Sequence, residues 1–140
     1  MIQFIIGEKG KGKTKVLLDK ANAEIKNASG NVVYIDKSAQ HMYELNNKIR
    51  LIDMSHYQLT SSDEFIGFIY GVISQDHDLE YMFLDSFMKN AHLEDGGDVA
   101  AVLKELDGIS KKFDVKFVIS ISVTRDQLPE GYAEGIIAEL

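Results

Sequence analysis

Residues 7–14 read Gly-Glu-Lys-Gly-Lys-Gly-Lys-Thr, a complete G-x-x-x-x-G-K-[ST] (Walker A) motif directly after the apolar run 2–6. In such a loop, glycines let successive backbone N–H groups turn inward, because no Cβ blocks the required dihedral angles. These N–H groups converge on one phosphate, and the following helix points its positive end at the same anion. The motif therefore requires a strand before the loop and a helix after it.

The motif also predicts a role for each of its residues. We expect Lys13 to reach the β- and γ-phosphates and the Thr14 hydroxyl to coordinate Mg²⁺. Lys15 would contribute its backbone N–H. The predicted phosphate-binding residues are Gly7, Glu8, Lys9, Gly10, Lys11, Gly12, Lys13, Thr14 and Lys15. The sequence thus predicts binding of ATP or another nucleoside triphosphate with Mg²⁺, the alternative being an unrelated glycine-lysine turn.

Length and composition limit the other possibilities. A chain of 140 residues with 45% hydrophobic residues predicts a single domain spanning 1–140. The absence of cysteine excludes disulfides and zinc–thiolate sites. The sequence begins without a basic, apolar leader and has no run long enough to span a membrane, so we expect a cytoplasmic protein with no membrane partner.

Charge is unevenly distributed along the chain. The formal net charge of −7 argues against nucleic acid as a partner, because non-specific affinity for it depends on clustered Lys and Arg. Five lysines nevertheless lie in or near the phosphate loop: Lys9, Lys11, Lys13, Lys15 and Lys20. These lysines attract a polyphosphate, or, apart from Lys13, they form an ordinary solvated loop and helix face.

Apolar runs and amphipathic segments alternate along the chain. The runs typical of buried strands are 2–6, 32–36, 81–84 and 115–123. The segments with helical spacing begin at Thr14, Ser61 and Asp98. This alternation predicts an α/β fold, a three-layer sandwich with a mostly parallel sheet.

Other segments carry weaker signals. The pattern of residues 49–54 predicts an edge strand or an extended connection. Residues 135–140 form either a final strand, which we favour, or the end of a short helix. Ser38 is the expected N-cap of a short helix. The helix that begins at Thr14 is expected to continue up to Gly30. Residues 87–97 have no clear period and predict a flexible loop.

Three polar residues end predicted strands, where a parallel sheet binds its ligands. Asp85 follows the run 81–84, and we expect it to associate with Mg²⁺ beside the phosphate loop. Asp36 ends another buried strand and is a candidate for positioning the attacking water. Ser122 is a candidate sensor of the γ-phosphate.

The order of these elements resembles that of the P-loop NTPases, and in particular a minimal RecA-like ATPase domain. Leu84-Asp85-Ser86 is similar to the hydrophobic-Asp-Ser ending common in that group, and Ser122 falls near its usual phosphate-sensing Gln. The resemblance implies a sheet in which the strand before Gly7 neighbours 115–123, followed by the Asp85 and Asp36 strands. It places the last strand on the far side of the first.

One difference from this family concerns catalysis. The family usually carries a glutamate just beyond the second strand, near Ser38 here, and other ATPases carry one in place of Ser86. Since that base activates the attacking water, we expect a weak or partner-stimulated ATPase, with Asp36 the nearest carboxylate. The alternative is a non-catalytic ATP-binding regulatory or assembly module.

A small-molecule or nucleotide kinase is a further alternative, because it shares the loop and needs no hydrolytic base. Arg50 and Arg125 are the only arginines, and neither lies in an obvious lid. A GTPase would need an Asn-Lys-x-Asp segment to recognise guanine, and residues 47–50 (Asn-Lys-Ile-Arg) lack the aspartate of that segment. The resemblance to ring-forming ATPases makes a homo-oligomer or protein partner possible, with Arg125 serving a neighbour's phosphate.

Overall fold

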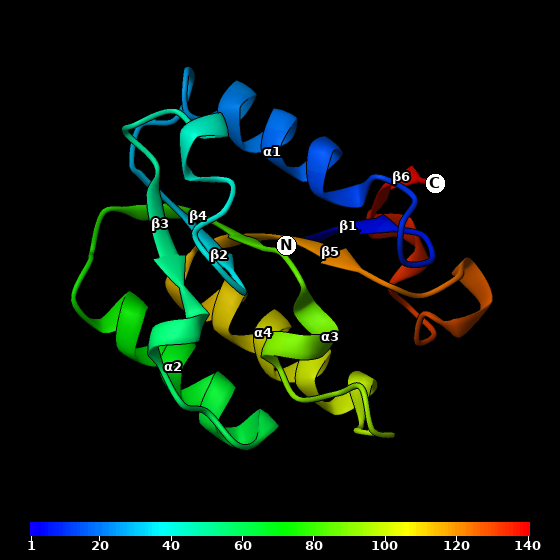
Figure 1. Cartoon of the computed structure of the whole chain (residues 1–140). Helices are drawn as coiled ribbons and strands as arrows, with labels where there is room; N and C mark the ends of the chain where they lie inside the picture. The colour runs from blue at the N-terminus through cyan, green and yellow to red at the C-terminus, as the bar shows by residue number, and fades with distance from the viewer.

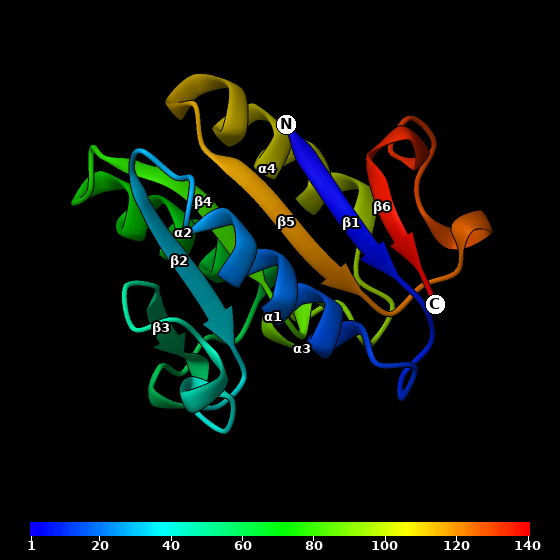
Figure 2. The ribbon, with the colours of Figure 1, turned by 90° about the horizontal axis from the view of Figure 1, so that it is seen from above.

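The computed structural model describes all of residues 1–140 and contains one six-stranded sheet in which every pairing is parallel. The strands are β1 (Ile2–Ile6), β2 (Asn31–Asp36), β3 (Arg50–Asp53), β4 (Leu79–Leu84), β5 (Lys116–Ile121) and β6 (Ile136–Glu139). Their order across the sheet is β3-β2-β4-β5-β1-β6. This order confirms the expected RecA-like arrangement, with β5 beside β1 and β6 on the far side of β1 (Figure 2).

Helices cover both faces of the sheet, as the predicted three-layer sandwich requires. Helix α1 (Lys13–Glu24) lies on one face, and α2 (Ser62–Ser74) and α4 (Val99–Phe113) lie on the other (Figure 1). The shorter elements are α3 (Phe87–Asn90) and four 3-10 turns, η1 (Met42–Glu44), η2 (Met54–His56), η3 (Arg125–Gln127) and η4 (Ala133–Gly135). None of the helices has both the length and the apolar character needed to cross a membrane.

The strands supply side chains alternately to two hydrophobic cores. In β4, Tyr81 and Phe83 face the core under α1, whereas Met82 and Leu84 face the core under α2 and α4. The α2 and α4 side holds 27 buried residues and the α1 side 11, so most of the hydrophobic stabilisation comes from the former. Leu45, from the connection before β3, helps α1 cover its face.

Two predicted helix starts are confirmed by their caps. The Ser61 side chain accepts a 3.1 Å hydrogen bond from the Glu64 N–H, and the Asp98 side chain accepts one of 3.0 Å from the Ala101 N–H. Each bond satisfies a backbone donor that the first helical turn leaves free. The buried face of α2 is Phe65, Ile66, Ile69, Val72 and Ile73, as its spacing predicts.

Two predicted helices are shorter than expected. Helix α1 ends at Glu24 rather than near Gly30, and residues 25–30 turn the chain into β2. After Ser38 only the 3-10 turn η1 forms, and the Ser38 hydroxyl accepts a local hydrogen bond from the Gln40 N–H. In both places the short segment must turn the chain toward the next strand, which leaves no room for further helical turns.

Residues 87–97 are more ordered than the sequence predicts. They contain α3, and Phe87, Ala91 and Leu93 are buried in the larger core. These apolar side chains pack against distant elements, which explains why they show no local period. The weaker strand predictions are confirmed, since β3 is the edge strand beside β2 and residues 136–139 form β6.

Candidate functional site

The phosphate loop connects β1 to α1 at the carboxyl edge of the sheet. Gly10 and Gly12 have φ angles of 81° and 92°, in the left-handed region that favours glycine. A Cβ at either position would meet no atom within 4 Å. These two positions therefore need glycine for the backbone conformation of the loop and not for space.

Lys13 is the first residue of α1 and is only 8% exposed. Its ammonium group donates a 2.8 Å hydrogen bond to the Glu8 carbonyl oxygen, so it lies within the curve of the loop. Burial lowers the pKa of Lys13 from its ordinary value, while the Asp85 carboxylate acts in the opposite direction. A buried ammonium beside loop amides is a favourable partner for a phosphate.

Asp85 directly follows β4 and is 3% exposed. Its Oδ1 lies 3.4 Å from the Thr14 hydroxyl oxygen and accepts a 2.8 Å hydrogen bond from the Ser86 N–H. Its Oδ2 accepts a 2.8 Å hydrogen bond from the Tyr34 hydroxyl. The two residues predicted to hold a metal, Thr14 and Asp85, are thus brought together across 71 positions of sequence.

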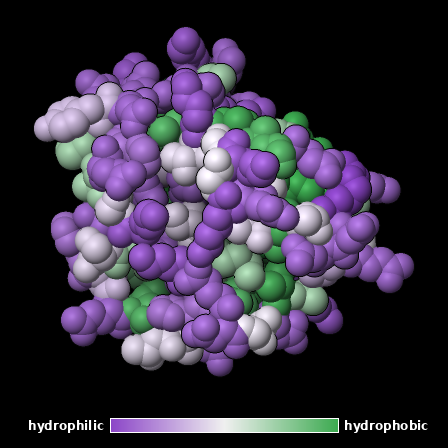
Figure 3. All heavy atoms as spheres, turned by 45° about the vertical axis from the view of Figure 1, so that its right-hand side comes forward, coloured by the Kyte–Doolittle hydropathy of each residue, from purple (hydrophilic) through white to green (hydrophobic).

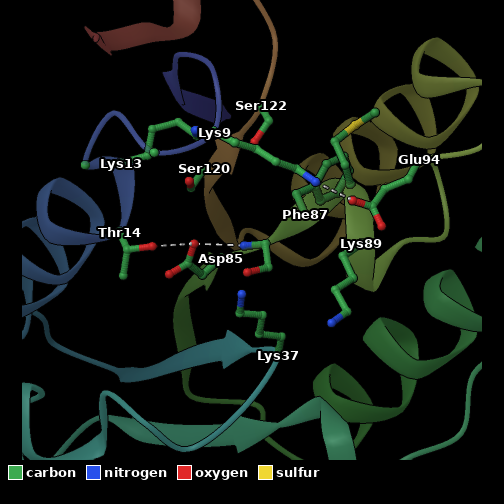
Figure 4. Close-up of a pocket in the computed structure, with 14 residues that line it drawn as sticks. Lys9, Lys13, Thr14, Lys37, Asp85, Phe87, Lys89, Glu94, Ser120 and Ser122 are labelled. Atoms are coloured by element: carbon green, nitrogen blue, oxygen red, sulfur yellow. Dashed lines mark hydrogen bonds and ion pairs between the residues drawn. The ribbon is translucent and has the colours of Figure 1, made fainter.

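A cavity of about 350 Å³ lies between the phosphate loop and the segment that follows Asp85. Gly10, Gly12, Lys13 and Thr14 line it on one side, and Ser122 also lines it, while its role as a phosphate sensor stays a prediction. Figure 4 shows the Lys13, Thr14 and Asp85 side chains around this space. The side of the molecule that carries the phosphate loop is mainly hydrophilic at its surface (Figure 3).

An ion pair crosses this cavity. Lys9, from the phosphate loop, extends toward Glu94, and its ammonium lies 3.1 Å from the Glu94 carboxylate (Figure 4). Both side chains line the cavity, and the Lys9 side chain is 80% exposed. The pair connects the loop to the segment after α3, and exposed pairs of this kind are weak and easily exchanged.

Two further lysines of the cavity were not expected from the sequence. Lys37 follows β2 and Lys89 belongs to α3, and both are exposed and line the cavity. Figure 4 shows them across from Lys9 and Ser122, with Lys37 pointing toward Asp85. The position of Lys37 directly after a strand end was the available signal, whereas nothing local marked Lys89.

Asp36 lies at the end of β2, as expected, but does not line the cavity. It is 2% exposed, its Oδ1 accepts a 2.7 Å hydrogen bond from the Lys37 N–H, and its Oδ2 has no hydrogen-bond partner. Burial, and secondarily the Asp85 carboxylate, raise the pKa of Asp36. At this strand end Lys37, and not Asp36, reaches the cavity, and the role of Asp36 in positioning water stays a prediction.

Other candidate groups lie elsewhere. Arg125 binds Glu139 through Nε at 3.2 Å and Nη2 at 3.0 Å. The chain contains no group of three or more His, Asp or Glu side chains able to hold a metal ion by themselves. A magnesium ion at Thr14 and Asp85 would therefore depend on phosphate oxygens for its remaining ligands.

No protein-family model matches this sequence, and no curated protein matches it significantly. Among solved structures, the chain is similar to the flagellar accessory protein FlaH from Methanocaldococcus jannaschii, with a TM-score of 0.62 and 13% sequence identity. The similarity covers 92% of this chain and 63% of the FlaH chain, so this chain spans less than two thirds of that protein. At this identity the likeness concerns the fold, and it supports the conclusion that the chain has a RecA-like α/β fold.

Proposed function

We propose that this protein binds a magnesium–nucleoside triphosphate complex, ATP in the first instance, in the cavity between the phosphate loop and Asp85. The observation that carries the proposal is the meeting of Thr14 and Asp85 beside that loop, at a separation of 3.4 Å. A hydroxyl and a carboxylate are hard oxygen donors, which suit Mg²⁺ when phosphate oxygens and water complete its shell. The donor set therefore fits the cofactor that the motif implies.

The charge of the cavity supports the same ligand. Four lysines line it, Lys9, Lys13, Lys37 and Lys89, against two carboxylates, those of Asp85 and Glu94. The difference, 4 − 2, gives a formal charge of +2 in a chain whose net charge is −7. A local positive charge of this kind favours a polyanion over a neutral or cationic ligand.

Slow or partner-stimulated hydrolysis is the activity that we propose for this site, with Lys13 and Ser122 contacting the terminal phosphate. The carboxylates near the site leave few candidates for a base. Asp85 is bonded to Thr14, Tyr34 and Ser86, Glu94 is paired with Lys9, and Asp36 is buried outside the cavity. The non-catalytic module is the second candidate, and this scarcity of free carboxylates favours it.

Calorimetric titration with ATP and a non-hydrolysable analogue, each with and without Mg²⁺, tests the proposal. We expect Mg²⁺-dependent binding that Lys13→Ala abolishes, whereas Lys104→Ala, an exposed lysine on α4, leaves it unchanged. Phosphate release on the same samples separates the two candidates, because a non-catalytic module binds without release. Absence of binding at millimolar nucleotide would reject the proposed function.

A further inference from the structure

A second cavity, of about 280 Å³, adjoins the phosphate-loop cavity and shares two residues with it, Lys37 and Lys89. Residues of η2 and the segment after it form one wall, and Asn90 and His92 form another. Because both lysines line both cavities, they stand on the boundary between the two spaces. A group bound between them would face the terminal phosphate of a nucleotide in the first cavity.

The lining of this second cavity is basic and contains no carboxylate. Besides the two lysines it comprises Met54, Ser55, Tyr57, Leu59, Asn90 and His92. The Tyr57 hydroxyl, the Asn90 amide and the His92 imidazole can donate hydrogen bonds, whereas the Ser55 hydroxyl already donates a 2.6 Å hydrogen bond to Oδ1 of Asp53. In a chain with 22 acidic and 15 basic residues, a cavity without any acid favours an anion.

Neither of the two lysines forms an ion pair within the protein, although Lys37 points toward Asp85 (Figure 4). Eight ion pairs occur in the structure, and neither Lys37 nor Lys89 takes part in any of them, whereas Lys9, Lys15 and Lys20 do. Like charges on one boundary repel each other unless an anion lies between them. The boundary between the two cavities therefore carries two lysines whose ammonium groups are not held by an ion pair.

We infer that this second cavity is a subsite for a phosphate-bearing ligand, whose phosphate lies between Lys37 and Lys89. A phosphate offers more acceptor oxygens than a carboxylate, so it can engage both ammonium groups and a neighbouring donor such as His92 or Tyr57. The position of the subsite next to a γ-phosphate rests on the proposed function. Such a ligand is either inorganic phosphate or a small phosphorylated molecule.

The test is a ¹H–¹⁵N NMR titration of the protein saturated with Mg²⁺ and a non-hydrolysable ATP analogue, which keeps the γ-phosphate position filled. Inorganic phosphate and glycerol 3-phosphate are the two probes. We expect saturable shifts at Ser55, Tyr57, Asn90 and His92, next to the shared lysines. Tighter binding of glycerol 3-phosphate indicates a phosphorylated molecule, and equal binding indicates the phosphate ion.

Variants make the assignment specific. We expect the double variant Lys37→Ala, Lys89→Ala to bind phosphate about a hundredfold more weakly, because each of the two lost charged hydrogen bonds removes about tenfold in affinity. Lys104→Ala, on the exposed face of α4, is the matched control and should bind phosphate as the unmodified protein does. Phosphate binding that survives in the double variant would overturn the inference.

Two other results separate this inference from the proposed function. In the first, the double variant loses affinity for the ATP analogue but not for ADP, and phosphate does not bind beside the analogue. That result would mean that the two lysines bind the γ-phosphate of the nucleotide, and it would reject the subsite. A parallel titration uses nucleotide-free protein. Phosphate shifts at Asn90 and His92 in a protein that binds no nucleotide would support the subsite and reject the proposed function.

Discussion

The Tyr34 hydroxyl donates a hydrogen bond of 2.8 Å to Oδ2 of Asp85, and both side chains are buried. The bond leaves Oδ1 on the side of Thr14, where the metal is expected. Burial and the Asp85 carboxylate hold the pKa of Tyr34 above its usual range, so the phenol remains a donor at all ordinary pH values. Tyr34 thus acts as a support for the carboxylate of the predicted magnesium site.

Tyr34→Phe should weaken the magnesium dependence of nucleotide binding. Loss of an outer partner of a metal ligand costs about tenfold in metal affinity, and loss of a hydrogen bond to a charged group costs about 1.5–3 kcal/mol of stability. The matched control is Tyr81→Phe, which removes a hydroxyl on the same face of the sheet, away from the cavity. The measurement is the nucleotide affinity of both variants by calorimetry at several Mg²⁺ concentrations. Equal magnesium dependence in the two variants would contradict the supporting role of Tyr34.

Asp36→Asn should stabilise the protein at neutral pH. The pKa of Asp36 is raised in the folded state, so between the unfolded and folded pKa values the folded state binds more protons. The free energy of unfolding therefore falls as pH rises through this window. Above the folded pKa, the folded state bears the full cost of keeping the Asp36 carboxylate ionised and buried. Asparagine removes this cost, and its advantage should disappear as pH falls toward the unfolded value of about 3.9.

Asp53 offers the matched comparison, because it pairs with Asp36 in the register of β2 and β3. Hydrogen bonds from Ser55 lower the pKa of Asp53, so Asp53→Asn should reduce stability above the unfolded pKa and lose that effect in acid. Urea unfolding of both variants at pH 7.5, 4 and about 3 measures the two effects, because the advantage of Asp36→Asn is lost near the unfolded pKa and the effect of Asp53→Asn only below it. Changes of the same sign in the two variants would contradict the pKa directions.

Glu94→Gln should raise nucleotide affinity, since it removes a negative charge from the cavity and frees Lys9. For an exposed pair the expected gain is about threefold at low salt, and it should vanish as salt screens the charges. Titrations at low and high salt measure it, with Glu105→Gln on the exposed face of α4 as the control. A fall in affinity would show that Glu94 contributes to binding the nucleotide.

The sequence predicts the fold well because the signals involved are local. The phosphate loop constrains its own strand and helix, and the apolar runs define the buried parallel strands. Ser61 and Asp98 mark helix starts through bonds to residues three positions away. The strand order, by contrast, came from resemblance to a family and not from these local signals, and the structure agrees with it.

The parts of the site that sequence reasoning missed depend on contacts between distant segments. Tyr34 is 51 positions from Asp85, and Lys9 is 85 positions from Glu94. A tyrosine within an apolar strand gives no sign of the partner that its hydroxyl will meet. The unexpected order of residues 87–97 has the same origin, because Phe87 and Leu93 pack against side chains from other elements.

The most direct test of the central claim is the location of the bound nucleotide. In ¹H–¹⁵N spectra of the 140-residue protein, the non-hydrolysable ATP analogue with Mg²⁺ should shift the amides of residues 7–15 and those of Asp85 and Ser86. The Gly10 and Gly12 amides should move most, because they line the cavity within the loop. Shifts confined to other surfaces, or no shifts at millimolar analogue, would contradict the account.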